Sequence, residues 1–294
     1  MPDTMTQPLR KPDRQAIPMD ILERLRATRG FVFDMDGTMV LGDKRNHGLN
    51  PLPGAIEFTR LLHDRGIPFV LFTNGTLRTP QDSTEALRRI GFALPDGAVM
   101  TPASTAADYF RRRGYRRVMV LGAEGMTQPL QDVGIETVPP SGKVEVDAVF
   151  VGWYRDFTMD ALEAACHAVW AGAGLYSASQ SLFFATAEGR SLGTSRAISA
   201  MIKDLTGCRI RIIGKPALEA LRVAGRHLGV KLKDLAVVGD DPSLEVPMAH
   251  RGHALAIGVG TGLGGADAFA QMPAAARPHI TVSGVDELLV LYDD

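Results

Sequence analysis

Short runs of apolar, β-branched and aromatic residues alternate with helical patterns along most of this chain. One unit joins a strand expected at residues 31–33 to a helix at 53–65, and the next joins a strand at 67–72 to a helix at 80–90. A strand followed by a helix and then by another strand favours parallel pairing, with helices on both faces of the sheet. The sequence therefore predicts an α/β fold built on a doubly wound parallel sheet.

The same alternation returns near the C-terminus. Strands are expected at residues 210–213, 235–238 and 254–259, and helices lie between them at about 216–228 and 243–250. We expect these strands to join the first two strands in one sheet. In an open parallel sheet, ligands bind beyond the carboxyl ends of the strands, so the residues that follow each strand are the candidates for chemistry.

The middle of the chain has a strand and helix series of its own. Its length of roughly 100 residues is enough for a compact domain. Because this segment interrupts the residues of one sheet, it is expected to act as a lid over that sheet. The predicted organisation is an N-terminal extension over residues 1–29, which includes a short helix at about 20–28, a catalytic core from 30–103 and 209–294, and an inserted α/β cap domain over 104–208.

The composition of the chain argues against nucleic acid and membranes as partners. The formal net charge of −1 provides no general attraction to nucleic acid or to an anionic membrane, since both usually call for an excess of basic residues. Cys166 and Cys208 lie far apart and form no Cys-x-x-Cys pair. Residues 1–29 lack the apolar region of a signal peptide. We therefore expect a cytoplasmic protein with a small-molecule partner, no nucleic-acid partner and no membrane partner.

Two acidic residues follow the first expected strand. The run FVFDMDGT at residues 31–38 places Asp34 and Asp36 two positions apart, so that both approach the same small volume at the end of the strand. Taken alone, this run also fits an Asp-rich turn. If a phosphate monoester binds there, Asp34 can attack phosphorus as a nucleophile, and Asp36 can protonate the leaving oxygen and later deprotonate water.

The ends of the other strands supply groups that suit a phosphate. The hydroxyl of Thr73 and the backbone amides of Asn74 and Gly75 can cradle phosphoryl oxygens. Lys215 can offset the phosphate charge, because a carboxylate facing one unit of phosphate charge at 4 Å costs about 4 kcal/mol at an effective dielectric near 20.

A divalent cation is expected beside the lysine. The carboxylates of Asp34 and Asp240, with the backbone carbonyl of Asp36, are hard oxygen ligands of the kind that Mg²⁺ prefers. The sequence thus predicts a site with Mg²⁺ as its cofactor.

Four ordered segments resemble the motifs of the haloacid dehalogenase-like (HAD) phosphatases. They are DMDGT at 34–38, TN at 73–74, GKP at 214–216 and GDD at 239–241. With roughly 100 residues inserted between the second and third segments, the chain is most similar to subclass IIA, the NagD-like or 4-nitrophenylphosphatase group. The resemblance covers about residues 30–290. It implies a Rossmann-like core, a C2-type cap, Mg²⁺, and hydrolysis of a phosphate monoester through Asp34.

The chain departs from the family pattern at three places. Where the family's fourth motif ends in Thr-Asp, this chain has Leu244-Glu245, and the resemblance places Asp241 and Glu245 around the metal ligands rather than on the metal. The cap segments that are usually Asn-Pro-Asp and Gly-Leu-Asp read SQS at 179–181 and GWY at 152–154. Because these cap loops face the leaving group in the family, the changes bear on the choice of substrate or on the turnover rate.

Several alternatives remain open at this point. A phosphoryl transferase or mutase would use the same aspartyl-phosphate, and a catalytically weak binding protein would keep the fold alone. The glycine-rich run at 258–265 formally matches a dinucleotide fingerprint, but it lacks the rest of a βαβ unit. The sequence does not rank sugar phosphates, phosphoglycolate, nucleotides and pyridoxal phosphate as substrates. A homodimer that pairs through the cap is a further hypothesis.

Overall fold

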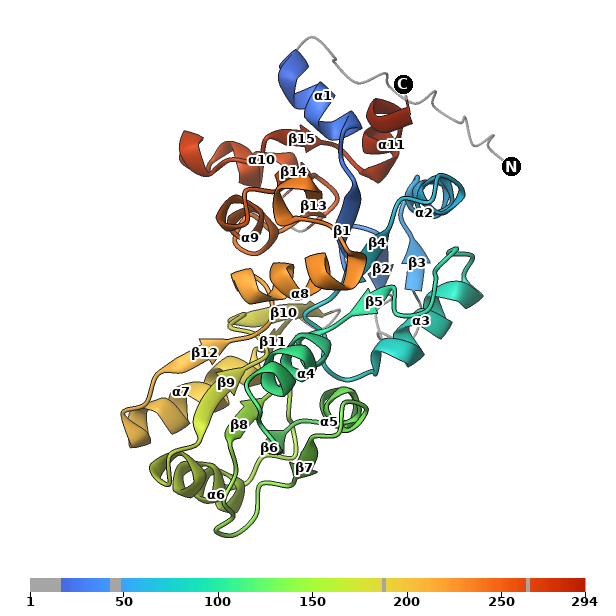
Figure 1. Cartoon of the computed structure of the whole chain (residues 1–294). Coiled ribbons are helices and arrows are strands. Elements are labelled where there is room, and N and C mark those ends of the chain that lie inside the picture. The colour runs from blue at the N-terminus through green and yellow to red at the C-terminus, as the bar shows by residue number, and fades with distance from the viewer. Residues whose placement is uncertain (1–16, 43–48, 187–188, 263–264, 294) are drawn as a thin grey trace, which may run out of the picture.

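The computed structural model describes residues 17–42, 49–186, 189–262 and 265–293 of the 294-residue chain. Within these ranges the chain forms two parallel sheets, one above the other in Figure 1, and two short antiparallel hairpins. The six-stranded sheet has the order β15-β14-β13-β1-β4-β5, and the five-stranded sheet has the order β12-β9-β8-β6-β7. Neighbouring strands are parallel throughout both sheets.

The six-stranded sheet contains elements from both ends of the chain. Its strands are β1 (Gly30–Asp34), β4 (Phe69–Phe72), β5 (Val99–Met100), β13 (Leu235–Gly239), β14 (Leu255–Val259) and β15 (Ile280–Val282). The helices packed around it are α1 (Met19–Arg26), α2 (Ala55–Asp64), α3 (Pro80–Arg89), α8 (Leu218–Leu228), α9 (Glu245–Arg251), α10 (Gly265–Ala270) and α11 (Val285–Asp293). Two 3₁₀ turns, η2 (Leu232–Asp234) and η3 (Ala274–Ala276), connect these elements.

Alternation of side chains along β1 explains why both faces of this sheet are covered. Phe31 and Phe33 point to one face, where they pack with Phe58 of α2 and with residues of α1 and α11. Val32 points to the other face and packs with residues of α8 and α9. The resulting Rossmann-like, doubly wound α/β arrangement confirms the predicted fold class.

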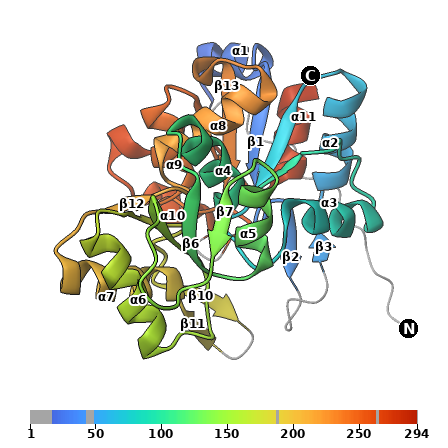
Figure 2. The ribbon, with the colours of Figure 1, turned by 60° about the horizontal axis from the view of Figure 1, so that its bottom comes forward.

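The five-stranded sheet is built in the same way. Its strands are β6 (Arg117–Leu121), β7 (Glu136–Val138), β8 (Ala148–Val151), β9 (Gly174–Ser177) and β12 (Ile210–Ile212). Helices α4 (Pro102–Arg112) and α5 (Glu124–Gln131) cover one face, and α6 (Met159–Trp170) and α7 (Thr194–Thr206) cover the other (Figure 2). This sheet therefore has its own two apolar cores.

One predicted strand is placed differently by the structure. The segment at 210–213 was expected in the six-stranded sheet, but β12 pairs with β9 at the edge of the five-stranded sheet. That placement was wrong, because a short apolar strand carries no mark of the sheet it joins, and the neighbouring Leu175–Ser177 segment offers it a parallel partner. The chain consequently crosses from the five-stranded sheet to α8 after residue 212.

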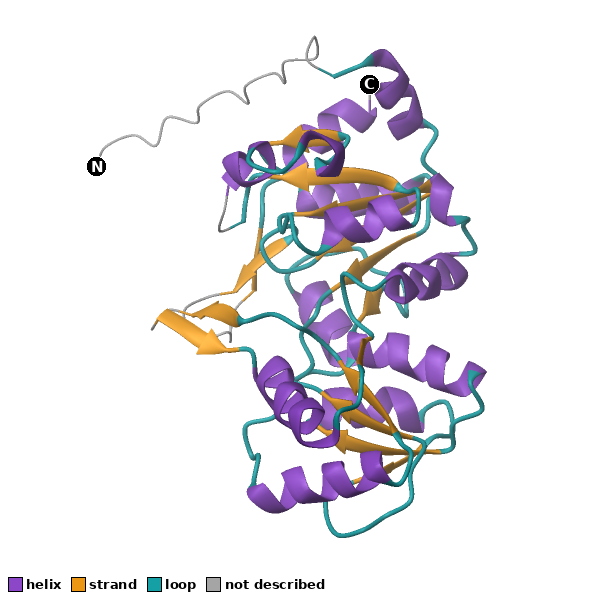
Figure 3. Ribbon diagram, turned by 90° about the vertical axis from the view of Figure 1, so that its left-hand side faces the viewer, coloured by secondary structure: helices purple, strands orange, loops and turns teal. Residues whose placement is uncertain are grey.

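One of the remaining elements was predicted, and two hairpins were not. Helix α1 matches the short helix expected near residues 20–28, whereas residues 1–16 of the predicted N-terminal extension lie outside the described residues. The hairpin of β2 (Val40–Gly42) and β3 (Leu49–Pro51) was not predicted, and neither was that of β10 (Phe183–Thr186) and β11 (Gly189–Leu192). In Figure 3, β10–β11 stands out to one side of the molecule, at a height between the two sheets. Among the described helices, none has the length and apolar character needed to cross a membrane.

Candidate active site

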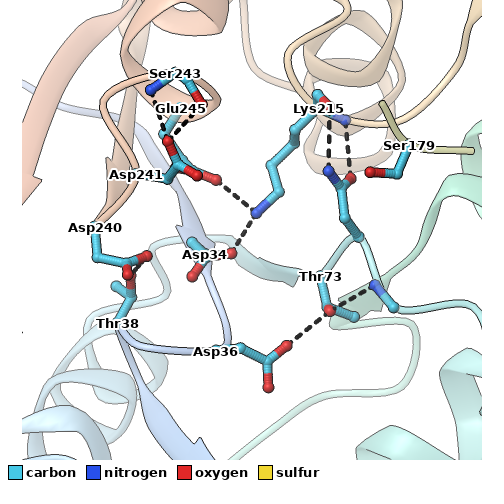
Figure 4. Close-up of polar contacts among 12 residues, drawn as sticks. Asp34, Asp36, Thr38, Thr73, Ser179, Lys215, Asp240, Asp241, Ser243 and Glu245 are labelled. Atoms are coloured by element: carbon cyan, nitrogen blue, oxygen red, sulfur yellow. Dashed lines mark hydrogen bonds and ion pairs between the residues drawn. The ribbon is translucent and has the colours of Figure 1, made fainter. Parts of the chain in front are cut away.

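The predicted site residues converge between the two sheets. Asp34 is the last residue of β1, Thr73 follows β4, and Asp240 follows β13, so all three lie at the carboxyl edge of the six-stranded sheet (Figure 4). Lys215 enters from the other side, in the connection between β12 and α8. The described structure therefore brings together side chains that lie up to 206 positions apart in the sequence.

Lys215 is the buried cation of this site. Its side chain is 1% exposed, and its Nζ contacts Oδ1 of Asp34 and lies 2.7 Å from Oε1 of Glu245. Burial opposes the charge, but the two carboxylates outweigh burial, so that the pKa of Lys215 is raised and the lysine stays protonated. Glu245, one methylene longer than the aspartate expected in the family, thus reaches the lysine directly.

Negative charge exceeds positive charge at this point of the described structure. Burial, with the charges of Asp34 and Glu245, raises the pKa of Asp240 to about 8. Burial and the charge of Asp34 raise the pKa of Glu245 to about 7, although Lys215 acts in the opposite direction. Oδ2 of Asp34 and Oε2 of Glu245 are buried and have no hydrogen-bond partner among the described residues. A second cation would relieve this repulsion.

The carboxylate of Asp36 contacts the motif that follows β4. Thr73 donates a hydrogen bond from its hydroxyl to Oδ2 of Asp36 at 2.9 Å, and the backbone N–H of Gly75 donates to the same hydroxyl at 2.9 Å. Asp36 keeps one solvent-exposed side, and protein atoms surround the rest of its carboxylate. That burial, with the charge of Asp34, raises the pKa of Asp36. A carboxyl group that holds its proton to higher pH is suited to general acid catalysis.

Glycines make room for the carboxylates. A Cβ on Gly37, whose φ is +94°, would lie 2.5 Å from Oδ2 of Asp240, and a Cβ on Gly262 would lie 1.8 Å from the same atom. Likewise, a Cβ on Gly239 would lie 2.2 Å from Cγ of Glu245. These glycines let the backbone close around the acids. Gly262 belongs to the glycine-rich run, so the described part of that run packs against the site.

The donor chemistry fits Mg²⁺. Among the described residues, no three His, Cys, Asp or Glu side chains gather as a metal cluster. The predicted ligand set, however, needs two carboxylates, Asp34 and Asp240, and one backbone carbonyl, and Mg²⁺ is commonly bound through one or two carboxylates while it keeps several waters. The two carboxylates lie close enough to shift the pKa of Asp240, and an oxygen of Asp34 is unpartnered.

Two predicted residues have contacts that the sequence did not indicate. Oδ1 of Asp241 accepts hydrogen bonds from the backbone N–H and the hydroxyl of Ser243, at 2.7 and 2.6 Å, so this oxygen closes the turn before α9. The side-chain amide of Asn74 hydrogen-bonds the main chain of Lys215. Ser179, in the loop after β9, is buried and is drawn near Lys215 in Figure 4. The contact between Asn74 and Lys215 was hidden by the 141 positions that separate them in the sequence.

Comparison with known proteins places this arrangement in a family. The model of the haloacid dehalogenase-like hydrolases matches residues 31–136, and a HAD-hydrolase-like model matches residues 212–288. The chain belongs to the haloacid dehalogenase-like hydrolases. Within them it falls in the NagD-like group, as the four motifs indicated.

Relatives cover between 76% and 92% of this chain. The 5'-nucleotidase YutF of Bacillus subtilis is 28% identical over 225 residues, 76% of this chain and 83% of its own length. Ribonucleotide monophosphatase NagD of Escherichia coli is 27% identical over 267 residues, 90% of this chain and 99% of its own. The structure of 4-nitrophenylphosphatase from Thermotoga maritima matches with a TM-score of 0.81 at 26% identity, over 92% of this chain and 99% of that one.

Proposed function

We propose that this protein is a Mg²⁺-dependent phosphatase that hydrolyses a small-molecule phosphate monoester through an aspartyl-phosphate on Asp34. The relatives named above are named as phosphatases or nucleotidases, which are hydrolases of phosphoric monoesters. The single observation that carries the proposal is the buried contact between Asp34 and Lys215, with an Asp34 oxygen left unpartnered at the end of β1.

The first half-reaction forms the covalent intermediate. An oxygen of Asp34 attacks phosphorus, the bond from phosphorus to the ester oxygen breaks, and Asp36 gives its proton to the departing oxygen. The Lys215 ammonium and the backbone amide of Asn74 bind the phosphoryl oxygens. The Thr73 hydroxyl and the Gly75 amide join them by exchanging their present hydrogen bonds to Asp36 and Thr73 for bonds to the phosphoryl group. Because Glu245 also contacts Nζ, the lysine keeps one carboxylate partner when Asp34 reacts.

The second half-reaction restores Asp34. Asp36, now ionised, removes a proton from water, the water oxygen attacks phosphorus, and the bond from phosphorus to Asp34 breaks to release inorganic phosphate. A Mg²⁺ ion held by Asp34, Asp240 and the backbone carbonyl of Asp36 would supply positive charge to the phosphoryl oxygens.

The five-stranded sheet and its helices are the proposed cap. Two contacts support this assignment: the backbone N–H of Trp153, which follows β8, donates to the Thr76 hydroxyl at 3.0 Å, and a Cβ on Gly125 would lie 2.5 Å from the carbonyl oxygen of Arg78. The loops of this sheet thus lie against the motif that follows β4. A cap in this position would exclude bulk water and contact the leaving group. Sugar phosphates, phosphoglycolate, nucleotides and pyridoxal phosphate remain the candidate substrates.

The test is release of inorganic phosphate from a panel of these esters, with Mg²⁺ and with a chelator. We expect turnover that requires Mg²⁺ and that is absent in Asp34→Asn. The matched control is Asp64→Asn, which changes an exposed aspartate at the end of α2 and should keep wild-type turnover. Release that is unaffected by both the chelator and Asp34→Asn would refute the proposal. Phosphate transfer to an added sugar in place of water would indicate a transferase.

A further inference from the structure

The side chain of Asn74 forms two hydrogen bonds with the main chain of Lys215. Nδ2 of Asn74 donates to the carbonyl oxygen of Lys215 at 3.1 Å, and the backbone N–H of Lys215 donates to Oδ1 of Asn74 at 3.0 Å (Figure 4). One amide thus satisfies both polar groups of a single residue, as a neighbouring strand would. Paired hydrogen bonds of this kind fix the position and the orientation of the main chain that they contact.

The bonded segment lies where the chain passes between the two sheets. β12 of the five-stranded sheet ends at residue 212, and α8, which packs against the six-stranded sheet, begins at residue 218. Asn74 belongs to the loop that follows β4 of the six-stranded sheet. The paired hydrogen bonds therefore tie the crossing segment to the sheet that carries Asp34.

Gly214 makes this close approach feasible. A Cβ at that position would lie 2.6 Å from Oδ1 of Asn74 and 2.3 Å from the carbonyl oxygen of Ala178. The backbone N–H of Gly214 donates to that same Ala178 oxygen at 3.2 Å. The segment is thus held from both sheets immediately before Lys215.

We propose that Asn74 is a positioning residue, whose side chain sets the location of the Lys215 ammonium by fixing the main chain of Lys215. This inference rests on the proposed function, in which Lys215 acts on the phosphoryl oxygens. Nδ2 and Oδ1 of Asn74 each bond the main chain of Lys215, so the inference assigns the side chain an action through the lysine. Displacement of a reacting group by about 1 Å costs on the order of 100-fold in rate.

The test is a double-mutant cycle on turnover of 4-nitrophenyl phosphate with saturating Mg²⁺. Asn74→Ala should lower kcat by about 10- to 100-fold. In a protein that already carries Lys215→Ala, the same substitution should have no further effect on kcat, because there is no ammonium left to position. Asn74→Asp keeps an acceptor for the Lys215 N–H and loses the donor, so it should be more active than Asn74→Ala. Gln81→Ala, which removes an exposed amide on α3, serves as the control and should match wild type.

Two kinetic results would overturn the inference. One is wild-type kcat in Asn74→Ala. The other is an equal loss from Asn74→Ala in the presence and absence of Lys215, since that loss would show a direct action on the substrate or a general loss of fold. Thermal unfolding of each variant separates the second cause from the first.

A crystal structure of Asn74→Ala tests the inference without any measurement of activity. We expect the Lys215 main chain to move and its Nζ to lose contact with either Asp34 or Glu245; an unmoved Lys215 would contradict the inference. If wild type neither binds inorganic phosphate in calorimetry nor turns over any ester, the proposed function fails, and the structure of the variant still tests whether Asn74 positions the lysine.

Discussion

The six-stranded and five-stranded sheets follow the same plan, but their carboxyl ends carry different side chains. In the six-stranded sheet, β1 ends in Asp34, and β13 is followed by Asp240. In the five-stranded sheet, β6 and β8 are followed by Gly122 and Gly152, and the loop after β9 contains Ser179. The acids of the site are thus concentrated in one sheet.

The edge strand β12 is the exception, because the segment after it carries Lys215. The buried lysine meets Asp34 and Glu245 of the other sheet. The segment after β12 contributes the ammonium and the six-stranded sheet contributes the carboxylates, and each buried charge needs the opposite charge as its partner. This site exists only where the two sheets meet, which makes it dependent on their relative position.

The largest effect on activity is expected when a residue at the carboxyl end of a strand is changed in the six-stranded sheet and a corresponding residue is changed in the five-stranded sheet. Asp34→Asn should reduce phosphate release by about 10³-fold or more, because an amide does not replace the attacking carboxylate. Ser179→Ala, in the loop after β9, should lower kcat by less than about 10-fold, because a cap contact orients substrate without reacting. Steady-state kinetics on one ester compare both variants, and equal losses would remove the distinction between the sheets.

Removal of the Lys215 ammonium should have the next largest effect, a loss in the free energy of unfolding. Lys215→Met leaves Asp34 and Glu245 buried and facing each other, at a cost of about 3–5 kcal/mol in the free energy of unfolding. Lys203→Met, on an exposed position of α7, is the control and should change that free energy by less than about 0.5 kcal/mol. Urea denaturation measures both. Equal stability of the two variants would show that the buried ion pairs contribute little.

Mg²⁺ should stabilise the protein through the six-stranded sheet. At a Mg²⁺ concentration of 100 times Kd, the free energy of unfolding should rise by about 2.7 kcal/mol, since the cation binds the folded state only. Asp240→Asn should lose most of this gain, and Asp132→Asn, on the exposed end of α5, should keep it. The measurement is the melting temperature across a Mg²⁺ titration. A gain that survives in Asp240→Asn would place the metal elsewhere.

The smallest expected effect is on the pH dependence of the free energy of unfolding, through His279 at the edge of the six-stranded sheet. Nδ1 of His279 accepts the backbone N–H of Ala256 at 2.9 Å, and burial, with the charges of Arg24 and His250, lowers the pKa of His279. A lowered pKa means that the neutral ring contributes stability above the ordinary value, near 6.5, and that this contribution is lost as pH falls through the value in the folded state.

His279→Asn keeps an acceptor but does not titrate, so its free energy of unfolding should fall less than that of wild type between neutral and acidic pH. Gln81→Asn, which changes an exposed residue of α3 that does not titrate, is the control and should retain the wild-type slope. Urea denaturation at several pH values measures the slopes. Identical slopes for His279→Asn and wild type would show that this ring does not couple to folding.

The motifs made much of the fold and of the site predictable. All five residues of β1 are buried, and the alternation of its side chains between the two faces of the sheet follows directly from the residue order. The topology rule for parallel sheets brings Thr73 and Asp240 to the same edge as Asp34. These features are local or follow from a general rule of chain topology.

The partners of long-range contacts could not be read from the sequence. β12 has the same apolar pattern as a strand of the other sheet, and its pairing with β9 depends on packing between segments that are distant in the chain. The side chain of Asn74 meets a residue 141 positions away. The space that Gly262 leaves for Asp240 is likewise visible only when the backbone positions are known.

The most direct test of the central claim is acid quenching during turnover, followed by peptide mass spectrometry. Wild type, stopped while it hydrolyses its best ester, should carry one phosphoryl group on the peptide that contains Asp34, and Asp34→Asn should carry none. Turnover by wild type with the phosphoryl group on another residue, or with none on the Asp34 peptide under conditions that preserve acyl phosphates, would contradict the account.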